Sequence, residues 1–178
     1  HSSLNLPSIL LLHGLMQDSE SFLVGGSSNS LVHSLVHAGY DVWLGNNRGT
    51  HYSQHHLNYH RGEKEYWDYS IDDLAAYDVP AMVHFILQHT HQPKLALIGF
   101  SQGSTQTFAS FSYNPSLNSK ISIFIALSPA LKTTGLQSTT LQDTLHKFPN
   151  LLFDLFGSLE MLPCCQTFQR VFSKSFFA

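Results

Sequence analysis

The pentapeptide Gly-Phe-Ser-Gln-Gly at residues 99–103 places a serine between two glycines. It follows the apolar run at residues 95–98 and opens a helical pattern, so Ser101 stands at a strand-to-helix turn. Such a turn strains the serine backbone and lifts its hydroxyl above the sheet, where a substrate carbonyl can reach it. Side chains at Gly99 and Gly103 would collide with neighbouring backbone. We expect Ser101 to be a nucleophile; an ordinary glycine-rich turn is the alternative.

A second signal follows the first apolar run of the chain, residues 8–12. This run ends at His13 and Gly14, and the next residue is Leu15. Beside a nucleophile in a strand-to-helix turn, one backbone N–H of this loop and the N–H after the nucleophile stabilise an oxyanion. We expect the backbone N–H groups of Leu15 and Gln102 to be these donors, since Gln102 also opens a helix with a positive dipole end. For His13 we expect a structural hydrogen bond rather than catalysis.

Short apolar runs and helical patterns alternate along the first two thirds of the chain. The runs that predict strands are residues 8–12, 40–44, 94–98 and 121–127. The helical patterns lie at residues 30–38, 70–92 and 102–112. Gly39 stands where a helix C-terminal cap is expected. The alternation predicts an α/β fold, with a mostly parallel sheet, right-handed crossovers and flanking helices.

The segment between the second and third predicted strands contains a loop and two helices. Residues 50–65 are polar and rich in histidine, which predicts a surface loop. Ser70 and Asp73 have the spacing of a capping box. Pro80 interrupts the pattern that follows, and Asp78 is placed to cap a second helix, since proline is tolerated in a first turn. The apolar spacing of that second helix predicts burial of Met82, Val83, Phe85, Ile86 and His89.

After about residue 130 the alternation stops. Residues 141–156 have helical spacing with many large apolar side chains, and no predicted strand follows them. We therefore divide the chain into residues 1–130, the N-terminal part of a core domain, and residues 131–178. The second segment is interpreted as the beginning of a helical cap, within which the chain ends.

The composition excludes several classes of protein. At 178 residues, 43% of them apolar, the chain is long enough for a domain with a hydrophobic core. A net charge of -3 without a basic run argues against nucleic acid as a partner. No apolar run reaches the roughly 18 residues that cross a bilayer. The adjacent Cys164 and Cys165 are not expected to bridge each other.

The beginning of the chain is not expected to act as a signal peptide. The first residues lack the basic region, apolar stretch and cleavage site of a signal peptide. The chain does not begin with methionine, so a preceding anchor or targeting signal stays open. The Asn-x-Ser/Thr pattern at residues 114–116 is excluded as a glycosylation site by Pro115.

Several stretches together resemble a known family. They are residues 11–15, 39–49, 66–73, 77–81, 98–104, 156–157 and 162–163. Trp-Leu-Gly-Asn-Asn-Arg-Gly at residues 43–49 is particularly specific. From about residue 9 to residue 163 the chain resembles the acid lipases of the α/β-hydrolases, which include gastric lipase, lysosomal acid lipase and the fungal steryl ester hydrolases. Phe100, where gastric and lysosomal members usually have histidine, makes it most similar to the fungal enzymes.

The resemblance implies the N-terminal half of an α/β-hydrolase fold and a serine hydrolase that forms an acyl-enzyme on Ser101. The implied substrates are steryl esters or triacylglycerols of long-chain fatty acids, presented at a lipid surface. No cofactor and no metal are implied. Association with a membrane or a lipid droplet is favoured, and secretion or a lysosomal location is the alternative.

The chain lacks the two residues that a serine nucleophile needs. A histidine must accept the serine proton and an acid must orient that histidine, in the chain order Ser, Asp or Glu, His. After Ser101 the candidates are Asp143, His146, Asp154 and Glu160, all in the predicted cap. We interpret the spacing of Asp143 and His146 as coincidence, because both are expected on one surface of the predicted cap, away from the serine turn. The resemblance implies that the acid and the histidine lie beyond residue 178. The 178-residue chain by itself is therefore expected to hydrolyse esters negligibly.

Two other clusters and one other class of protein remain as alternatives. The histidines of the predicted loop suit a metal site by spacing, but no carboxylate or cysteine completes a familiar pattern. Capping and ion-pair roles are favoured for Asp68, Asp72 and Asp73 over paired catalytic carboxylates. The histidines concerned are His51, His55, His56 and His60. A non-catalytic module of the same fold that binds lipid or protein is the alternative function.

Overall fold

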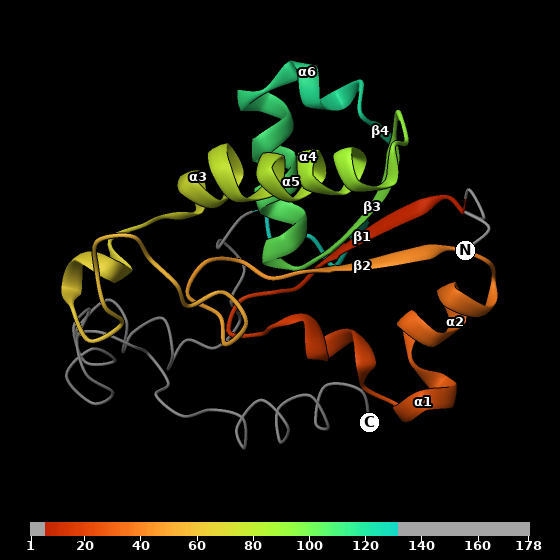
Figure 1. The fold of residues 1–178 in the computed structure, drawn as a ribbon, viewed down its shortest axis with the longest axis horizontal. Helices are drawn as coiled ribbons and strands as arrows, with labels where there is room; N and C mark the ends of the chain where they lie inside the picture. The colour runs from red at the N-terminus through yellow and green to blue at the C-terminus, as the bar shows by residue number, and fades with distance from the viewer. Residues whose placement is uncertain (1–5, 132–178) are drawn as a thin grey trace. The chain divides into compact units, whose positions relative to one another are not determined.

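The structure, a computed structural model, describes residues 6–131. Residues 6–53 and 69–130 form one compact unit, and the loop of residues 54–68 belongs to a second. The described strands are β1 (Ser8–Leu12), β2 (Asp41–Gly45), β3 (Leu95–Phe100) and β4 (Ile121–Leu127). The described α-helices are α1 (Gly26–Asn29), α2 (Leu31–His37), α3 (Ile71–Asp73), α4 (Val79–Thr90), α5 (Gln102–Tyr113) and α6 (Pro115–Asn118) (Figure 1). Short 3₁₀ turns lie at Ser19–Leu23 and Lys64–Trp67.

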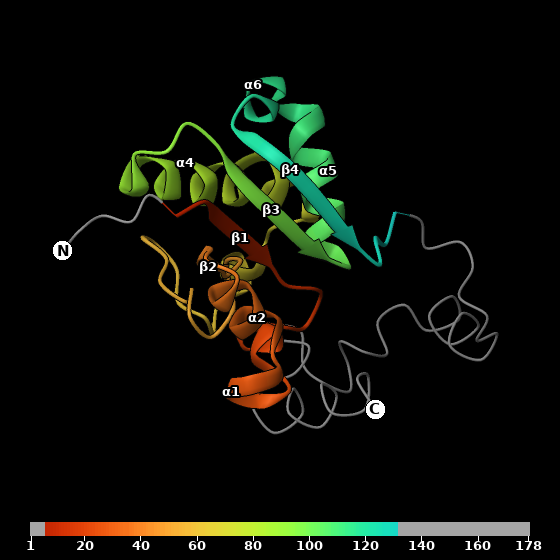
Figure 2. The ribbon, with the colours of Figure 1, turned by 90° about the vertical axis from the view of Figure 1, so that its right-hand side faces the viewer.

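The strands of the first unit form one parallel sheet in the order β2-β1-β3-β4. All residues of β1 are buried, as expected for an inner strand of a parallel sheet that is covered on both faces. The strands point the same way, so the segments that follow β1, β3 and β4 lie together at the carboxyl-terminal edge of the sheet, where the strands end (Figure 2). The predicted α/β class and the parallel sheet are confirmed.

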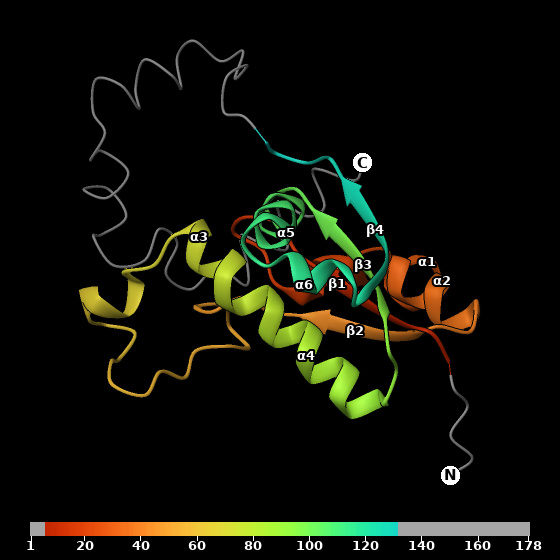
Figure 3. The ribbon, with the colours of Figure 1, turned by 90° about the horizontal axis from the view of Figure 1, so that it is seen from above.

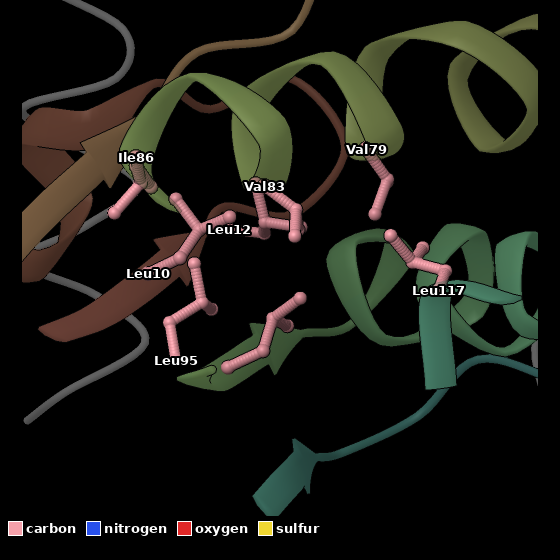
Figure 4. Packing of buried hydrophobic residues seen from close by; sticks show 8 residues of the cluster. Leu10, Leu12, Val79, Val83, Ile86, Leu95 and Leu117 are labelled. Carbon is pink, nitrogen blue, oxygen red and sulfur yellow. The ribbon is translucent and has the colours of Figure 1, made fainter. Parts of the chain in front are cut away.

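Apolar clusters lie on both faces of this sheet. Leu10 and Leu12 point to the face covered by α4, where they pack with residues such as Val83 (Figure 4). Ile9 and Leu11 point to the opposite face, where α2 and the first 3₁₀ turn contribute the cluster. Figures 1 and 2 show α4, α5 and α6 on one side of the strands and α2 on the other, and Figure 3 looks onto the side that carries α4, α5 and α6. The alternation of side chains along β1 thus supplies both cores.

The chain from Ser70 to Thr90 is a helix with one wide turn, not two separately capped helices. The predicted capping box of Ser70 and Asp73 is confirmed. A π turn at Leu74–Asp78 joins α3 to α4. Pro80 has no N–H to donate, and the wide turn moves the preceding carbonyl groups so that the proline fits. The prediction that Asp78 caps a new helix is wrong, because its own backbone is helical (φ -68, ψ -50) and its side chain makes no cap.

The carboxylate of Asp78 instead binds Arg48, in the loop after β2. It accepts hydrogen bonds from the Arg48 backbone N–H at 3.0 Å and from Nε at 2.8 Å. The Asp78 side chain is only 10% exposed and that of Arg48 is 38% exposed, so solvent screens the ion pair in part. The Arg48 guanidinium also lies 5.7 Å from the centre of the Tyr69 ring.

We expect Asp78→Asn to lower the free energy of unfolding by about 2 kcal/mol. The substitution removes the negative charge and replaces one of the two carboxylate oxygens that accept from Arg48 with an NH₂ group, which cannot accept. Asp72→Asn is the matched control, because Asp72 is exposed and accepts a bond from Tyr113; we expect a change below about 0.5 kcal/mol. Urea unfolding of the two variants measures both values, and equal values would contradict the assignment.

The buried face of α4 differs from the prediction at two positions. Val83 and Ile86 are buried as predicted. Phe85 is 60% exposed and His89 is exposed, so their predicted burial is wrong. The two rings stack on each other and meet the edge of the Trp43 ring. Trp43 belongs to β2, an edge strand, and no further strand of the described sheet lies beyond it to cover this side of α4.

The strand at the other edge, β4, carries exposed apolar side chains. Ile123 is 55% exposed and Ile125 40% exposed.

Of the predicted cap, residues 132–178 lie outside the described residues. Within residues 6–131, no helix has the length and apolar character that a membrane span requires.

Candidate active site

Ser101 occupies a strained turn between β3 and α5. Its backbone has φ 50 and ψ -113, and residues other than glycine rarely adopt a positive φ. The Ser101 N–H donates to the carbonyl of Leu127 at 2.9 Å, and the Ser101 carbonyl accepts from the N–H of Ser104 at 3.0 Å. The side chain is half-buried. The turn predicted for this pentapeptide is therefore present.

Both glycines of the turn lie where a side chain has no room. A Cβ at Gly99 would come within 2.7 Å of the Gly103 carbonyl carbon. A Cβ at Gly103 would come within 2.3 Å of the Leu12 carbonyl oxygen and 2.8 Å of the His13 oxygen. Backbone atoms block both positions, so the start of α5 lies directly on the end of β1.

The loop after β1 lies against the serine. A Cβ placed on Gly14 would be 3.2 Å from the Ser101 Cβ. The Gly14 N–H donates to the Gln17 side chain at 3.0 Å. The Leu15 side chain is 61% exposed, which suits a residue that acts through its backbone. The structure thus brings this loop and Ser101 together, whereas the donor roles of Leu15 and Gln102 remain predictions.

His13 lies buried beneath this loop, with both ring nitrogens engaged. Nδ1 is 2.8 Å from the Gly14 carbonyl oxygen, and Nε2 is 3.3 Å from the backbone N–H of Asn47. A carbonyl requires a donor and an N–H requires an acceptor, so the ring is neutral with its proton on Nδ1. Burial lowers the pKa of His13 below its ordinary value of 6.5, which also favours the neutral ring. These contacts agree with a structural role.

His13 should make the fold sensitive to acid. When the pH falls below the unfolded-state pKa of 6.5, the imidazole of His13 is protonated in the unfolded chain but stays neutral in the folded protein. Stability is therefore lost as the pH falls below this value, and the loss ends at the lowered folded-state pKa. We therefore expect the free energy of unfolding to be lower at about pH 5 than at about pH 7.5, with His13 contributing to the difference. The measurement is urea unfolding at both pH values, in which His13→Asn should show a smaller loss; equal losses would contradict the assignment.

Three of the four described non-glycine residues with positive φ follow strand ends at the edge of the sheet that carries Ser101, and the fourth, His91, caps α4. Met16 (φ 57), Ser101 (φ 50) and Ser128 (φ 46) have positive φ without being glycine. They follow the ends of β1, β3 and β4, three adjacent strands. Backbone strain of this kind concentrates at functional sites. Sequence reasoning missed Met16 and Ser128, because neither residue type signals a positive φ.

The histidines of the loop after β2 do not form a metal site in the described structure. Nδ1 of His56 accepts from the N–H groups of Asn58 and Tyr59, at 3.1 and 3.0 Å, and caps a turn. No group of three metal-ligating side chains occurs among residues 6–131.

The acidic residues of the α3 region have structural partners. Asp73 closes the capping box, and the Ser70 hydrogen bonds lower the pKa of its carboxyl. Asp72 accepts a hydrogen bond from the Tyr113 hydroxyl at 2.8 Å. The acidic and histidine candidates that follow Ser101 in the predicted cap lie outside the described residues.

A parallel sheet whose inner strand ends in a strained serine, at the head of a helix, is the arrangement of α/β-hydrolases. Residues 7–177 match the family model described as the alpha/beta hydrolase fold, and the chain belongs to this family.

Curated relatives bear the names of lipases. The chain is 45% identical to the "Probable lipase C1672.09" of Schizosaccharomyces pombe, over 97% of this chain and 37% of that protein. It is 40% identical to the human "Lipase member K", over 84% of this chain and 41% of that protein. It is also 40% identical to the bovine "Gastric triacylglycerol lipase", over 88% of this chain and 39% of that protein. The resemblance to acid lipases is thus confirmed, and the chain spans about two fifths of these relatives' length.

Solved structures agree on the fold. The mature Bacillus licheniformis lipase BlEst2 matches with a TM-score of 0.56 at 19% identity, over 99% of this chain and 60% of that one. An extracellular alpha/beta-hydrolase of a Paenibacillus species matches with a TM-score of 0.55 at 14% identity, over 94% of this chain and 64% of that one.

Proposed function

We propose that this chain carries the nucleophile and the oxyanion donors of a serine hydrolase that acts on lipid carboxylic esters. The observation that carries the proposal is the Ser101 backbone, at φ 50 between β3 and α5, beside the loop after β1. A strained serine of this kind presents its hydroxyl to a carbonyl carbon. The names of the curated relatives support ester hydrolysis as the reaction.

In the proposed mechanism the Ser101 oxygen attacks the ester carbonyl carbon, and its proton passes to a histidine. The carbonyl oxygen becomes an anion that the N–H groups of Leu15 and Gln102 bind. Collapse of this intermediate expels the alcohol, which takes the proton, and leaves an acyl-enzyme. Water, activated by the same histidine, then releases the fatty acid and frees Ser101. We propose that the histidine and its acid come from the part of the relatives' length that this chain does not cover.

The proposed substrates are hydrophobic esters, either steryl esters or triacylglycerols. The chain is similar both to a snake "Putative lysosomal acid lipase/cholesteryl ester hydrolase" and to gastric triacylglycerol lipases. Apolar side chains of the segment after β1 are exposed: Leu15 by 61%, Met16 by 45% and Leu23 by 45%. Exposed apolar side chains in this segment support contact with a lipid surface. Association with a membrane or a lipid droplet is part of the proposal.

Hydrolysis by the full-length gene product that carries this chain tests the function. Fatty acid release from emulsified trioleoylglycerol and cholesteryl oleate compares the two substrate classes. A fluorophosphonate probe, with mass spectrometry of the labelled peptide, tests whether Ser101 reacts. Labelling with release from either ester supports the proposal, and the faster substrate identifies the preference. A folded protein that neither reacts nor releases fatty acid would instead be a non-catalytic module.

The 178-residue chain by itself is expected to hydrolyse p-nitrophenyl esters negligibly. A serine without a general base is a poor nucleophile. The measurement compares this chain with the full-length gene product under the same conditions. Turnover by the short chain that disappears in Ser101→Ala would contradict this prediction and would require a base among the 178 residues.

A further inference from the structure

Three consecutive polar residues after β2 each hold a different element. The Asn46 side chain accepts from the Ser19 N–H at 3.0 Å and donates to the Ser19 hydroxyl at 3.0 Å. The Asn47 side chain pairs with Gln106 of α5. Arg48 holds the π turn before α4, as described above. An isolated surface turn needs no such contacts, so this stretch has a role that the serine turn alone does not explain.

The pair of Asn47 and Gln106 is a closed, buried amide pair. Asn47 Nδ2 donates to Gln106 Oε1 at 3.1 Å, and Gln106 Nε2 donates to Asn47 Oδ1 at 2.8 Å. Asn47 is 3% exposed and Gln106 is fully buried. Breaking one side of such a pair leaves the other amide unsatisfied away from water. The pair therefore fixes the distance between the loop after β2 and α5.

Asn47 also sets the state of His13 through its backbone. Its N–H points to Nε2 of the ring, which leaves the ring proton on Nδ1, opposite the Gly14 carbonyl. A trans peptide directs its C=O and its N–H to opposite sides. His13, by holding the Gly14 carbonyl, turns the Leu15 N–H of the same peptide away from the histidine. Gly14 itself borders Ser101.

Gln106 lies on the same helix, α5, as Gln102, the other predicted oxyanion donor. It lies four residues after Gln102 on the same helix, one turn or about 6 Å further along the axis. A helix turn is stiff, so anchoring Gln106 also anchors the N–H of Gln102.

We propose that Asn47 and Gln106 are positioning residues that hold the two halves of the oxyanion hole in register. Asn47 acts on Leu15 through His13 and Gly14, and Gln106 acts on Gln102 through the first turn of α5. This inference rests on the proposed function, because the N–H groups that the two amides position serve as oxyanion donors only in the proposed hydrolase reaction. Neither amide touches the substrate.

Gln106→Met tests the proposal in the full-length gene product, because it keeps the side-chain length and removes the pair. We expect kcat for a p-nitrophenyl ester to fall between about 10-fold and 100-fold, with KM within about 3-fold. The inhibition constant of a long-chain alkyl trifluoromethyl ketone, which forms an oxyanion on the serine, should rise in parallel with the fall in kcat. A merely structural role would not link these two quantities.

Gln92→Met is the matched control. Gln92 accepts from the Ser8 N–H at 3.1 Å and donates to the Leu6 carbonyl, at the start of β1 and not at the edge that carries Ser101. We expect its kcat and inhibition constant to stay at the wild-type values at a temperature where both variants are folded. Equal effects of the two substitutions would overturn the positioning role. Wild-type protein that fails to react with a fluorophosphonate at Ser101 would overturn the proposed function instead.

An exchange of the two amides provides a test that does not depend on Gln106→Met folding. Gln106→Asn alone shortens one partner, and Asn47→Gln alone lengthens the other. The double variant restores the total length of the pair. If the two substitutions acted independently, its fold loss in kcat would equal the product of the two single-variant losses. We expect its kcat to be at least about 5-fold higher than that value. Independent effects of the two substitutions would overturn the proposal.

Discussion

Replacing Ser101 with alanine is expected to lower kcat of the full-length gene product by about 10⁵-fold or more. The substitution removes the oxygen that forms the acyl-enzyme, while the backbone N–H groups that bind the oxyanion stay in place. KM for a p-nitrophenyl ester should change little. Steady-state kinetics measures both constants, and a fluorophosphonate probe should no longer label the protein.

Ser110→Ala is the matched control for this prediction. Ser110 lies on the same helix, α5, and its buried hydroxyl has no hydrogen-bond partner within residues 6–131. Its removal should leave kcat within about 2-fold of wild type and the thermal midpoint within a few degrees. If Ser101→Ala kept more than about a tenth of the activity, the nucleophile would have to be another residue.

Gly103→Ala is expected to cost about 3 kcal/mol of stability or more and to lower the thermal midpoint by about 10 °C. The new Cβ would be 2.3 Å from the Leu12 carbonyl oxygen, which belongs to an inner strand and cannot rotate away. Relief requires α5 to move off the end of β1. Because α5 begins at the residue after Ser101, such a movement should also displace the serine.

Gly62→Ala provides the comparison, because a Cβ at Gly62 meets no atom of the described residues within 4 Å. We expect its thermal midpoint and its activity to match wild type. Differential scanning calorimetry and ester hydrolysis measure the two effects for both variants. A Gly103→Ala protein with unchanged stability and activity would show that the contact between α5 and β1 is looser than described.

Local features of the fold were predictable because neighbouring residues determine them. The strands at Ser8–Leu12 and Ile121–Leu127 have the predicted bounds, since short apolar runs between turn residues are typical of strands, although only the first of the two is buried. The capping box of Ser70 and Asp73 was predictable for the same reason, as its atoms lie three residues apart. The serine turn needed only a strand, two glycines and a helix in succession.

Features that depend on partners far along the chain were not predictable. Asp78 was interpreted as a helix cap, but it binds Arg48, 30 residues earlier. Phe85 was predicted to be buried by helical spacing, but α4 passes an edge strand there. The residue type of a side chain indicates the kind of partner it needs, such as an ion, an amide or an apolar group. It does not indicate which residue of the chain supplies that partner.

The sequence by itself determined that a serine would stand between a buried strand and a helix, with a short loop after the first strand available to assist it. Tertiary structure decided that this loop lies against Ser101, that His13 is neutral beneath it, and that Asn47 meets Gln106. The physical reason is the order of the strands. Only when β1 lies between β2 and β3 do three segments distant in the sequence come together at one edge of the sheet.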